Sequence, residues 1–426
     1  MATARPHRAT PRGTDARLDQ LVAASDVVLT CGAGGVGKTS VAAALAATAA
    51  VQLDAKVLVL TVDPAKRLAT AMGLSGFGNT ETVVGRDAFA AVGAQPRGEL
   101  WAAMLDTRAS WDELVGRHAP DELTRDAILA NPLYRNLIST FVQSHDYIAM
   151  ERLHEIHASG RYDLVVVDTP PSRHAIDLLD APARMADFFA SRLLRWLIAP
   201  YRSRLANLAS KPFQAVADRL LGASFLADIA EFFLLFQSMY DGFVERAKSV
   251  EQTLRDPTTS FLVVTTLEAG PVQEAMFFCD ELERRGLRLG ALVCNRTLPP
   301  GLGDPAARRL ADHWQRHPEA AAATLSPVAD HGPPAAGSDA GPDRQDRDRQ
   351  DVDRQDVDPQ DRDRLAQVFT TMGQSFIDYA MLAAREAELA ARLAPLAERR
   401  AVVPQLDHDI ADLGHLLKLG RALWPT

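Results

Sequence analysis

Residues 27–40 of the chain read VVLTCGAGGVGKTS and carry the strongest indication of its fold class. The apolar half is rich in β-branched residues and predicts a buried strand, and the alanine-rich residues 41–50 that follow predict a helix. The loop between them matches the pattern G-x-x-x-x-G-K-[ST], in which glycines let successive backbone N–H groups point at one anion. We therefore predict a phosphate-binding loop made of Gly32, Ala33, Gly34, Gly35, Val36, Gly37, Lys38, Thr39 and Ser40.

This loop precedes a helix, and the positive end of the helix dipole favours a bound phosphate. In loops of this kind the lysine contacts the β- and γ-phosphates of a nucleotide, and the hydroxyl after it binds Mg²⁺. We expect Lys38 and Thr39 to take these two roles, Lys38 as a catalytic as well as a binding residue. The expected cofactors are ATP and Mg²⁺.

Two carboxylates are expected close to the loop. Asp168 ends the apolar run DLVVVD (163–168), and Asp63 follows the run KVLVLTV (56–62). Ligands of open α/β sheets bind outside the carboxyl ends of the strands, so both side chains should face the loop. An acid after four apolar residues is the usual partner of Mg²⁺, through a water, and we assign this role to Asp168.

The other apolar runs extend the same sheet. They are continuous rather than alternating, which indicates strands buried on both faces and hence a mostly parallel sheet covered by helices. We predict about seven or eight strands in an α/β fold. Besides the three strands above, the candidates are FLVVTT (261–266), GALVCN (290–295) and, more weakly, ELWAAML (99–105).

Helical patterns and an unusual polar segment complete the organisation. We expect inserted helices at 107–158 and 177–256. An apolar stripe in the second insertion is either buried in the core or forms a face for an apolar client: Phe225, Ile229, Phe232, Phe236, Tyr240 and Phe243. A region of Pro, Gly, Ala and repeated Asp, Arg and Gln cannot bury a core. The predicted parts are therefore a basic tail (1–18), an ATPase domain (19–326), a disordered linker (327–364) and the C-terminal part of that domain (365–426).

Composition excludes several classes of protein. The 426 residues are 47% hydrophobic and 24% charged, which is ordinary for a folded protein, and the net charge of −9 does not favour nucleic acid as a partner. Three cysteines do not form a disulfide scaffold. We expect no transmembrane segment, because no run of 18 apolar residues exists. We expect no secretory leader, because the N-terminal stretch MATARPHRATPRGTDAR has four arginines but no apolar core.

The base of the nucleotide can be predicted from the end of the last central strand. A guanine site would carry N-K-x-D, whose acid accepts hydrogen bonds from the base, but the acid position here is Leu298. Asn295 remains, and its amide can both donate to and accept from the adenine edge. ATP is therefore favoured over GTP.

Taken together, these motifs resemble those of the ArsA-type ATPases, the P-loop NTPases of arsenite pumps and of tail-anchored-protein targeting. The similar segments are GAGGVGKTS (32–40), VDPA (62–65), DTPPSRHA (168–175) and VCNR (293–296), with a closing strand and helix in VVPQLDHDIADL (402–413). The resemblance implies that Asp63 activates the attacking water and that Asp168 and His174 belong to a switch that reports nucleotide state. It also implies dimers whose helical subdomain rearranges when ATP binds.

Three features depart from the family pattern. Ala33 replaces the signature lysine that reaches the partner's phosphates, and Arg173 replaces a glycine of the switch. The positive charge that Ala33 lacks could come from one of two sources, a lysine of a paralogous subunit or Arg173 of the same chain. The cysteines do not form the cluster that arsenite needs; we expect Cys31, Cys279 and Cys294 to be small buried residues.

The function predicted is an ATPase switch that handles a protein or membrane-associated client, as a homodimer or with a paralogous ATPase. Two alternatives stay open: a non-hydrolysing ATP-binding scaffold, and a ParA- or MinD-like partitioning ATPase on a membrane surface. The second rests on an amphipathic C-terminal segment with Leu413, Leu416, Leu417, Leu423 and Trp424, which otherwise docks on the sheet. The expected location is the cytoplasm, with peripheral membrane attachment as a further option.

Overall fold

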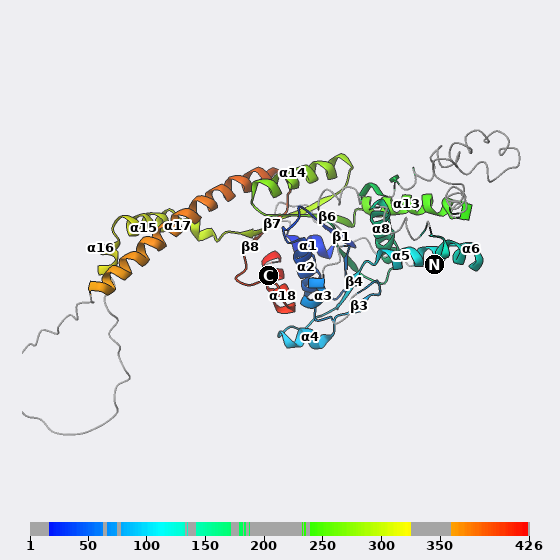
Figure 1. Ribbon diagram of the computed structural model, residues 1–426, viewed down its shortest axis with the longest axis horizontal. Helices are drawn as coiled ribbons and strands as arrows, with labels where there is room; N and C mark the ends of the chain where they lie inside the picture. Colours follow the sequence, from blue (N-terminus) through cyan, green and yellow to red (C-terminus); the bar gives the residue numbers. More distant parts are fainter. Residues whose placement is uncertain are drawn as a thin grey trace, which may run out of the picture. The chain divides into compact units, whose positions relative to one another are not determined.

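A computed structural model gives the structure of the chain (Figure 1). It describes residues 17–62, 66–74, 78–132, 134, 142–171, 179–181, 183–184, 187, 232, 234–235, 239–324 and 359–424. The chain divides into two compact units. The first consists of the residues up to Thr297 together with Leu389–Thr426, and the second is Leu298–Glu388.

The first unit is built on one eight-stranded sheet with the order β3-β4-β2-β5-β1-β6-β7-β8. Its neighbouring strands are parallel except for β3 and β4, which are antiparallel. The strands are β1 (Val27–Cys31), β2 (Lys56–Thr61), β3 (Thr82–Val83), β4 (Glu99–Met104), β5 (Leu164–Asp168), β6 (Thr259–Thr265), β7 (Leu289–Thr297) and β8 (Arg400–Pro404). The predicted α/β class with a mostly parallel sheet is confirmed.

Both faces of the sheet are buried, as the continuous apolar runs predicted. Alternate residues of one strand enter two different cores: Val27 and Leu29 point into one, and Val28 into the other. The helices that cover the face of Val28 are α1 (Leu18–Ala23), α2 (Lys38–Gln52), α3 (Lys66–Ala71), α4 (Arg86–Ala91) and α18 (Leu413–Leu423). The opposite face is covered by α5 (Thr107–His118), α6 (Glu122–Ala130), α8 (Val142–Ala158), α13 (Tyr240–Arg255) and α14 (Ala269–Arg284).

All six strands predicted from apolar runs exist, including the weak candidate β4. The two-residue strand β3 was not predicted, because two residues carry no periodicity. In the second insertion, the described members of the apolar stripe are buried: Phe232 and Phe243 lie in the core that contains Leu29. Phe225, Ile229 and Phe236 lie outside the described residues.

Among its described residues, the second unit contains the 3₁₀ helix η1 (Pro300–Gly303) and the α-helices α15 (Pro305–Arg316), α16 (Pro318–Ala323) and most of α17 (Pro359–Leu393). α15 and α17 pack through the rings of Trp314 and Phe369, whose centroids are 5.2 Å apart. Gly373 allows close approach, because a side chain there would overlap the carbonyl of Ala311. α17 begins within the segment that we expected to be linker; residues 325–358 lie outside the described residues.

The C-terminal helix α18 docks on α2 rather than presenting its apolar face. Leu413, Leu416, Leu423 and Trp424 are all buried. This is the docking that the sequence analysis gave as the option opposed to a membrane-surface helix. In the part of the chain that the structure describes, no helix has the length and apolar character needed to cross a bilayer.

The contact between α18 and α2 depends on a glycine. A methyl group on Gly420 would overlap the Thr48 hydroxyl and lie 3.1 Å from the carbonyl oxygen of Ala44. Gly420→Ala should therefore lower the free energy of unfolding by about 1–3 kcal/mol, the usual cost of overpacking a core. Chemical denaturation measures the change.

Gly116→Ala is the matched control, because Gly116 lies inside α5 with nothing within 4 Å of the added methyl. That variant should be neutral or more stable by up to about 1 kcal/mol, since alanine has the higher helix propensity. Equal losses in the two variants would show that α18 and α2 do not pack closely at Gly420.

Candidate functional site

The loop between β1 and α2 has the backbone that the glycine pattern predicts. Gly35 and Gly37 have φ values of 80° and 92°, which favour glycine, and Gly37 is the N-cap of α2. Gly32 passes so close to β6 that a side chain would overlap the Val264 carbonyl. The loop is therefore held between the sheet and α2, and its own residues Ala33 and Val36 have buried side chains.

Lys38 spans this loop. Its side chain is only 7% exposed, and its ammonium Nζ donates a hydrogen bond to the carbonyl oxygen of Ala33 at 2.8 Å. A charged group at this depth needs such partners, and phosphate oxygens would offer stronger, charge-assisted ones. The predicted contact of Lys38 with the β- and γ-phosphates stays a prediction.

Asp168 lies at the end of β5, next to the loop. Its carboxylate is fully buried, and Oδ2 accepts hydrogen bonds from Thr39 Oγ1 at 2.7 Å and from Thr61 Oγ1 at 3.0 Å. The structure thus brings together the two residues that the sequence analysis assigned to the metal. Mg²⁺ prefers oxygen ligands such as hydroxyl and carboxylate groups, so Thr39 and Asp168 fit that ion.

Thr169 follows Asp168 at the end of β5 and contacts the neighbouring strand β1. Its hydroxyl donates to the carbonyl oxygen of Thr30 at 2.7 Å and lies 3.7 Å from the Cys31 sulfur. Burial raises the pKa of Cys31 to about 12, so the thiol stays protonated and unreactive. All three cysteines are buried and free, as expected. Across the described residues, no three His, Cys, Asp or Glu side chains form a metal-binding cluster.

Asn295, at the end of β7, supports the loop from the side. Its amide Nδ2 donates to the carbonyl oxygen of Val36 at 2.8 Å, and a side chain on Gly37 would collide with it. The amide is 5% exposed. Its expected role at the adenine edge stays a prediction.

Arg296 is a site residue that the sequence analysis missed. Its Nη1 donates to the carbonyl oxygen of Gly35 at 3.1 Å, directly beside the contact made by Asn295. The only sequence cue was its position after Asn295, where a guanine-binding motif has lysine. Asp63, Arg173 and His174 lie outside the described residues, so their predicted roles stay predictions.

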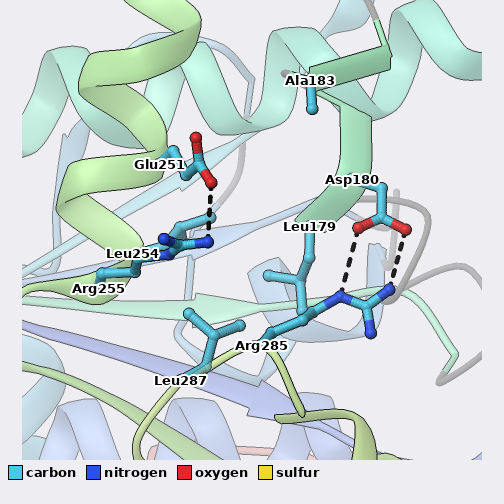
Figure 2. A pocket seen from close by; sticks show the side chains of 8 residues that line it. All are labelled: Leu179, Asp180, Ala183, Glu251, Leu254, Arg255, Arg285 and Leu287. Carbon is cyan, nitrogen blue, oxygen red and sulfur yellow. Dashed lines mark hydrogen bonds and ion pairs between the residues drawn. The ribbon is translucent and has the colours of Figure 1, made fainter.

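A pocket lies beside α13 and α14, at residues 179–183, which follow the predicted switch segment in the sequence. Figure 2 shows Arg285 pointing at Asp180, with Nη2 to Oδ2 at 3.0 Å and Nε to Oδ1 at 3.3 Å. Leu179, Leu254 and Leu287 also line the pocket, with Glu251 paired to Arg255. The charges are paired with each other: Arg285 joins Asp180 to the end of α14, and Arg255 pairs with Glu251 within α13. The glycine loop is therefore the candidate nucleotide site.

The Asp168 geometry yields a direct test of the metal site. Asp168→Asn keeps an oxygen acceptor but removes the charge, so the gain in nucleotide affinity caused by Mg²⁺ should fall by about 10–100-fold, the usual loss for outer-sphere partners. Nucleotide affinity without Mg²⁺ should not fall. Calorimetric titration with and without Mg²⁺ measures both.

Thr61→Val is the control, since it removes one hydrogen bond from the same oxygen and leaves the carboxylate in place. It should keep the full Mg²⁺ effect. An Asp168→Asn protein that responds to Mg²⁺ as strongly as this control would exclude Asp168 from the metal site.

Comparison with known proteins agrees with this geometry. The family model for anion-transporting ATPases matches residues 25–317. An uncharacterised protein of Streptomyces coelicolor is 32% identical over 301 residues, which is 68% of either chain. ATPase GET3 of Malassezia globosa is 26% identical over 63% of this chain and 72% of its own length. The arsenical pump-driving ATPase of Escherichia coli is 27% identical over 68% of this chain and 42% of its own length. Since the family model covers the glycine loop, the Asp168 strand and the Asn295 strand, this chain belongs to the anion-transporting ATPase (ArsA) family.

Proposed function

We propose that this chain binds and hydrolyses ATP with Mg²⁺ and uses the cycle as a conformational switch for a protein or membrane-associated client. The observation that carries the proposal is the buried contact of Asp168 with Thr39, beside a loop crossed by Lys38. These residues supply a phosphate cradle, a metal-binding hydroxyl and a carboxylate within one small site. Mg²⁺, when bound there, would neutralise charge on the phosphates.

The residues of this chain would act in sequence. The loop N–H groups bind the phosphates, and Lys38 exchanges the Ala33 carbonyl for phosphate oxygens. Asp63, which follows β2, would orient the attacking water and take up its proton. A water held in line with the phosphate is the main requirement for such a transfer.

The contacts of Asp168 with two other elements support the proposed role as a nucleotide-dependent switch. Its carboxylate ties the helix of the loop, through Thr39, to the end of β2, through Thr61. β2 leads directly to Asp63, and β5 leads directly to the segment with Arg173 and His174. A ligand that changes the Thr39–Asp168 contact would therefore act on both segments at once.

The client is proposed to be a protein or a membrane-associated molecule rather than an arsenical. Arsenite needs clustered thiolates, whereas Cys31, Cys279 and Cys294 are buried and belong to separate elements. The 177–256 insertion contains 8 of the 16 Phe residues. Because Phe232 and Phe243 are buried in the core, a face for an apolar client is proposed only for the Phe residues outside the described ones. The ParA- or MinD-like alternative rested on an apolar helix face at the C-terminus, and this face of α18 is buried against α2. A non-hydrolysing scaffold remains the second candidate, favoured by Ala33.

The test is ATP binding and turnover by the purified protein. Wild type should bind ATP in a Mg²⁺-dependent way and hydrolyse it slowly. Lys38→Ala should lose affinity and turnover together, because the loop loses its ammonium. Asp63→Asn should keep affinity but slow hydrolysis by roughly a hundredfold or more, the scale of a lost general base. Binding without any turnover, alone or with a partner, would favour the scaffold.

Ala33 determines how a dimer could work. We propose that the chain acts with a second ATPase subunit, either a copy of itself or a paralogue that contributes a lysine. The Ala33 side chain is buried and uncharged, so it cannot neutralise a partner's phosphates. A charge supplied across an interface contributes about 10³–10⁵ to such rates.

Ala33→Lys should therefore raise turnover and promote ATP-dependent dimerisation, measured by hydrolysis assays and by light scattering. Arg173→Ala, in the wild-type background, is the comparison. Loss of all basal activity in that variant would show that Arg173 supplies the charge within the same subunit. If Ala33→Lys changes neither turnover nor dimerisation, position 33 has no role across an interface.

A further inference from the structure

Arg296 is held in an unfavourable backbone conformation at the edge of the nucleotide site. Its φ of 56° is the only positive value among the described non-glycine residues. The pairing of β7 with β8 shifts register at this point, between Cys294 and Thr297. Left-handed backbone costs free energy for residues with a side chain and persists where surrounding structure requires it. Here it takes the Arg296 side chain out of the sheet, where it is exposed and reaches the loop.

Two successive residues then hold two successive carbonyls of the loop. Asn295 binds Val36, and Arg296 binds Gly35. The two side chains differ in exposure, since the Asn295 amide is buried and the Arg296 guanidinium is open to solvent. Arg296 contacts the loop through Nη1, so the plane of its exposed guanidinium is open to a ligand.

The position of that face matches where a base would lie. Phosphates bind to the N–H groups of the loop, so the ribose and base extend past it along the carboxyl ends of the strands. β7 is the second strand from β1 in that direction, and Arg296 is at its carboxyl end. Leu298 stands where a guanine site has an acid, so no carboxylate at that position adds to the hydrogen bonds expected from Asn295.

We propose that the Arg296 guanidinium is a stacking wall for the purine base of the nucleotide, a role that rests on the proposed ATP binding. The guanidinium is planar and stacks on aromatic rings, which an ammonium cannot do in the same way. The hydrogen bond from Nη1 to Gly35 fixes one end of the plane. Arg296 thereby couples base binding to the conformation of the phosphate loop.

The experiment compares two ligands, MgATP and Mg-tripolyphosphate, which has the phosphates but no base. Their affinities are measured by titration for wild type, Arg296→Ala and Arg296→Lys. Lysine retains the charge and a donor for the Gly35 carbonyl but has no planar face. Both variants should lose about tenfold more affinity for ATP than for tripolyphosphate, the scale of one stacked base.

Arg288→Ala is the matched control, because Arg288 also donates to a backbone carbonyl, that of Pro257, just before the start of β7. It should bind both ligands as wild type does. Thermal unfolding shows whether each variant folds.

Equal losses for ATP and tripolyphosphate would overturn the proposal and make Arg296 a support of the loop only. Full ATP affinity in Arg296→Lys would also overturn it. Wild type that binds tripolyphosphate but gains nothing from the base would refute base stacking, whereas wild type that binds neither ligand would refute the proposed function itself.

Discussion

The buried carboxylate of Asp168 is the interaction on which the arrangement of the site depends. A carboxylate with no exposure is costly unless hydrogen bonds compensate for lost hydration, and here the Thr39 and Thr61 hydroxyls donate to the same oxygen. Those two hydroxyls come from α2 and β2, so one side chain on β5 joins three elements around the loop. Because β5 lies between β1 and β2 in the sheet, this contact also fixes which segments leave the sheet beside the phosphate cradle. The Asp168 carboxylate thus both joins these elements and belongs to the proposed metal site.

The other side of the loop is held by β6 and β7, through close contacts and through hydrogen bonds from side chains of β7. Gly32 runs against the Val264 carbonyl and Gly37 against the Asn295 amide, and neither position has room for a side chain. Asn295 and Arg296 then satisfy carbonyls that the turn leaves without helix or sheet partners. The loop is therefore preorganised before any ligand arrives, so little conformational entropy remains to be lost on binding.

Much of this could be predicted because the information is local. The continuous β-branched runs predict doubly buried strands, and parallel strands end at one edge, so the proximity of Asp168 to Thr39 followed from their positions alone. The two-residue β3 and the positive φ of Arg296 could not be predicted. The first depends on pairing with β4, and the second on a register shift between β7 and β8. The compact unit of α15, α16 and most of α17 was not predicted either, because the helical pattern of a segment does not specify which other helix it packs against.

The contact of Lys38 with Ala33 separates two properties of position 33. The ammonium binds the backbone carbonyl, which every residue type has, so the ligand-free loop would close in the same way with another side chain there. A phosphate must compete with that carbonyl for Lys38, and it does so with charge-assisted bonds that are stronger than a neutral acceptor provides. The change from lysine to alanine at this position therefore leaves the internal closure of the loop intact. In the proposed dimer, the change removes a charge that could contact the partner's phosphates, so we expect it to affect assembly and rate rather than the fold of the site.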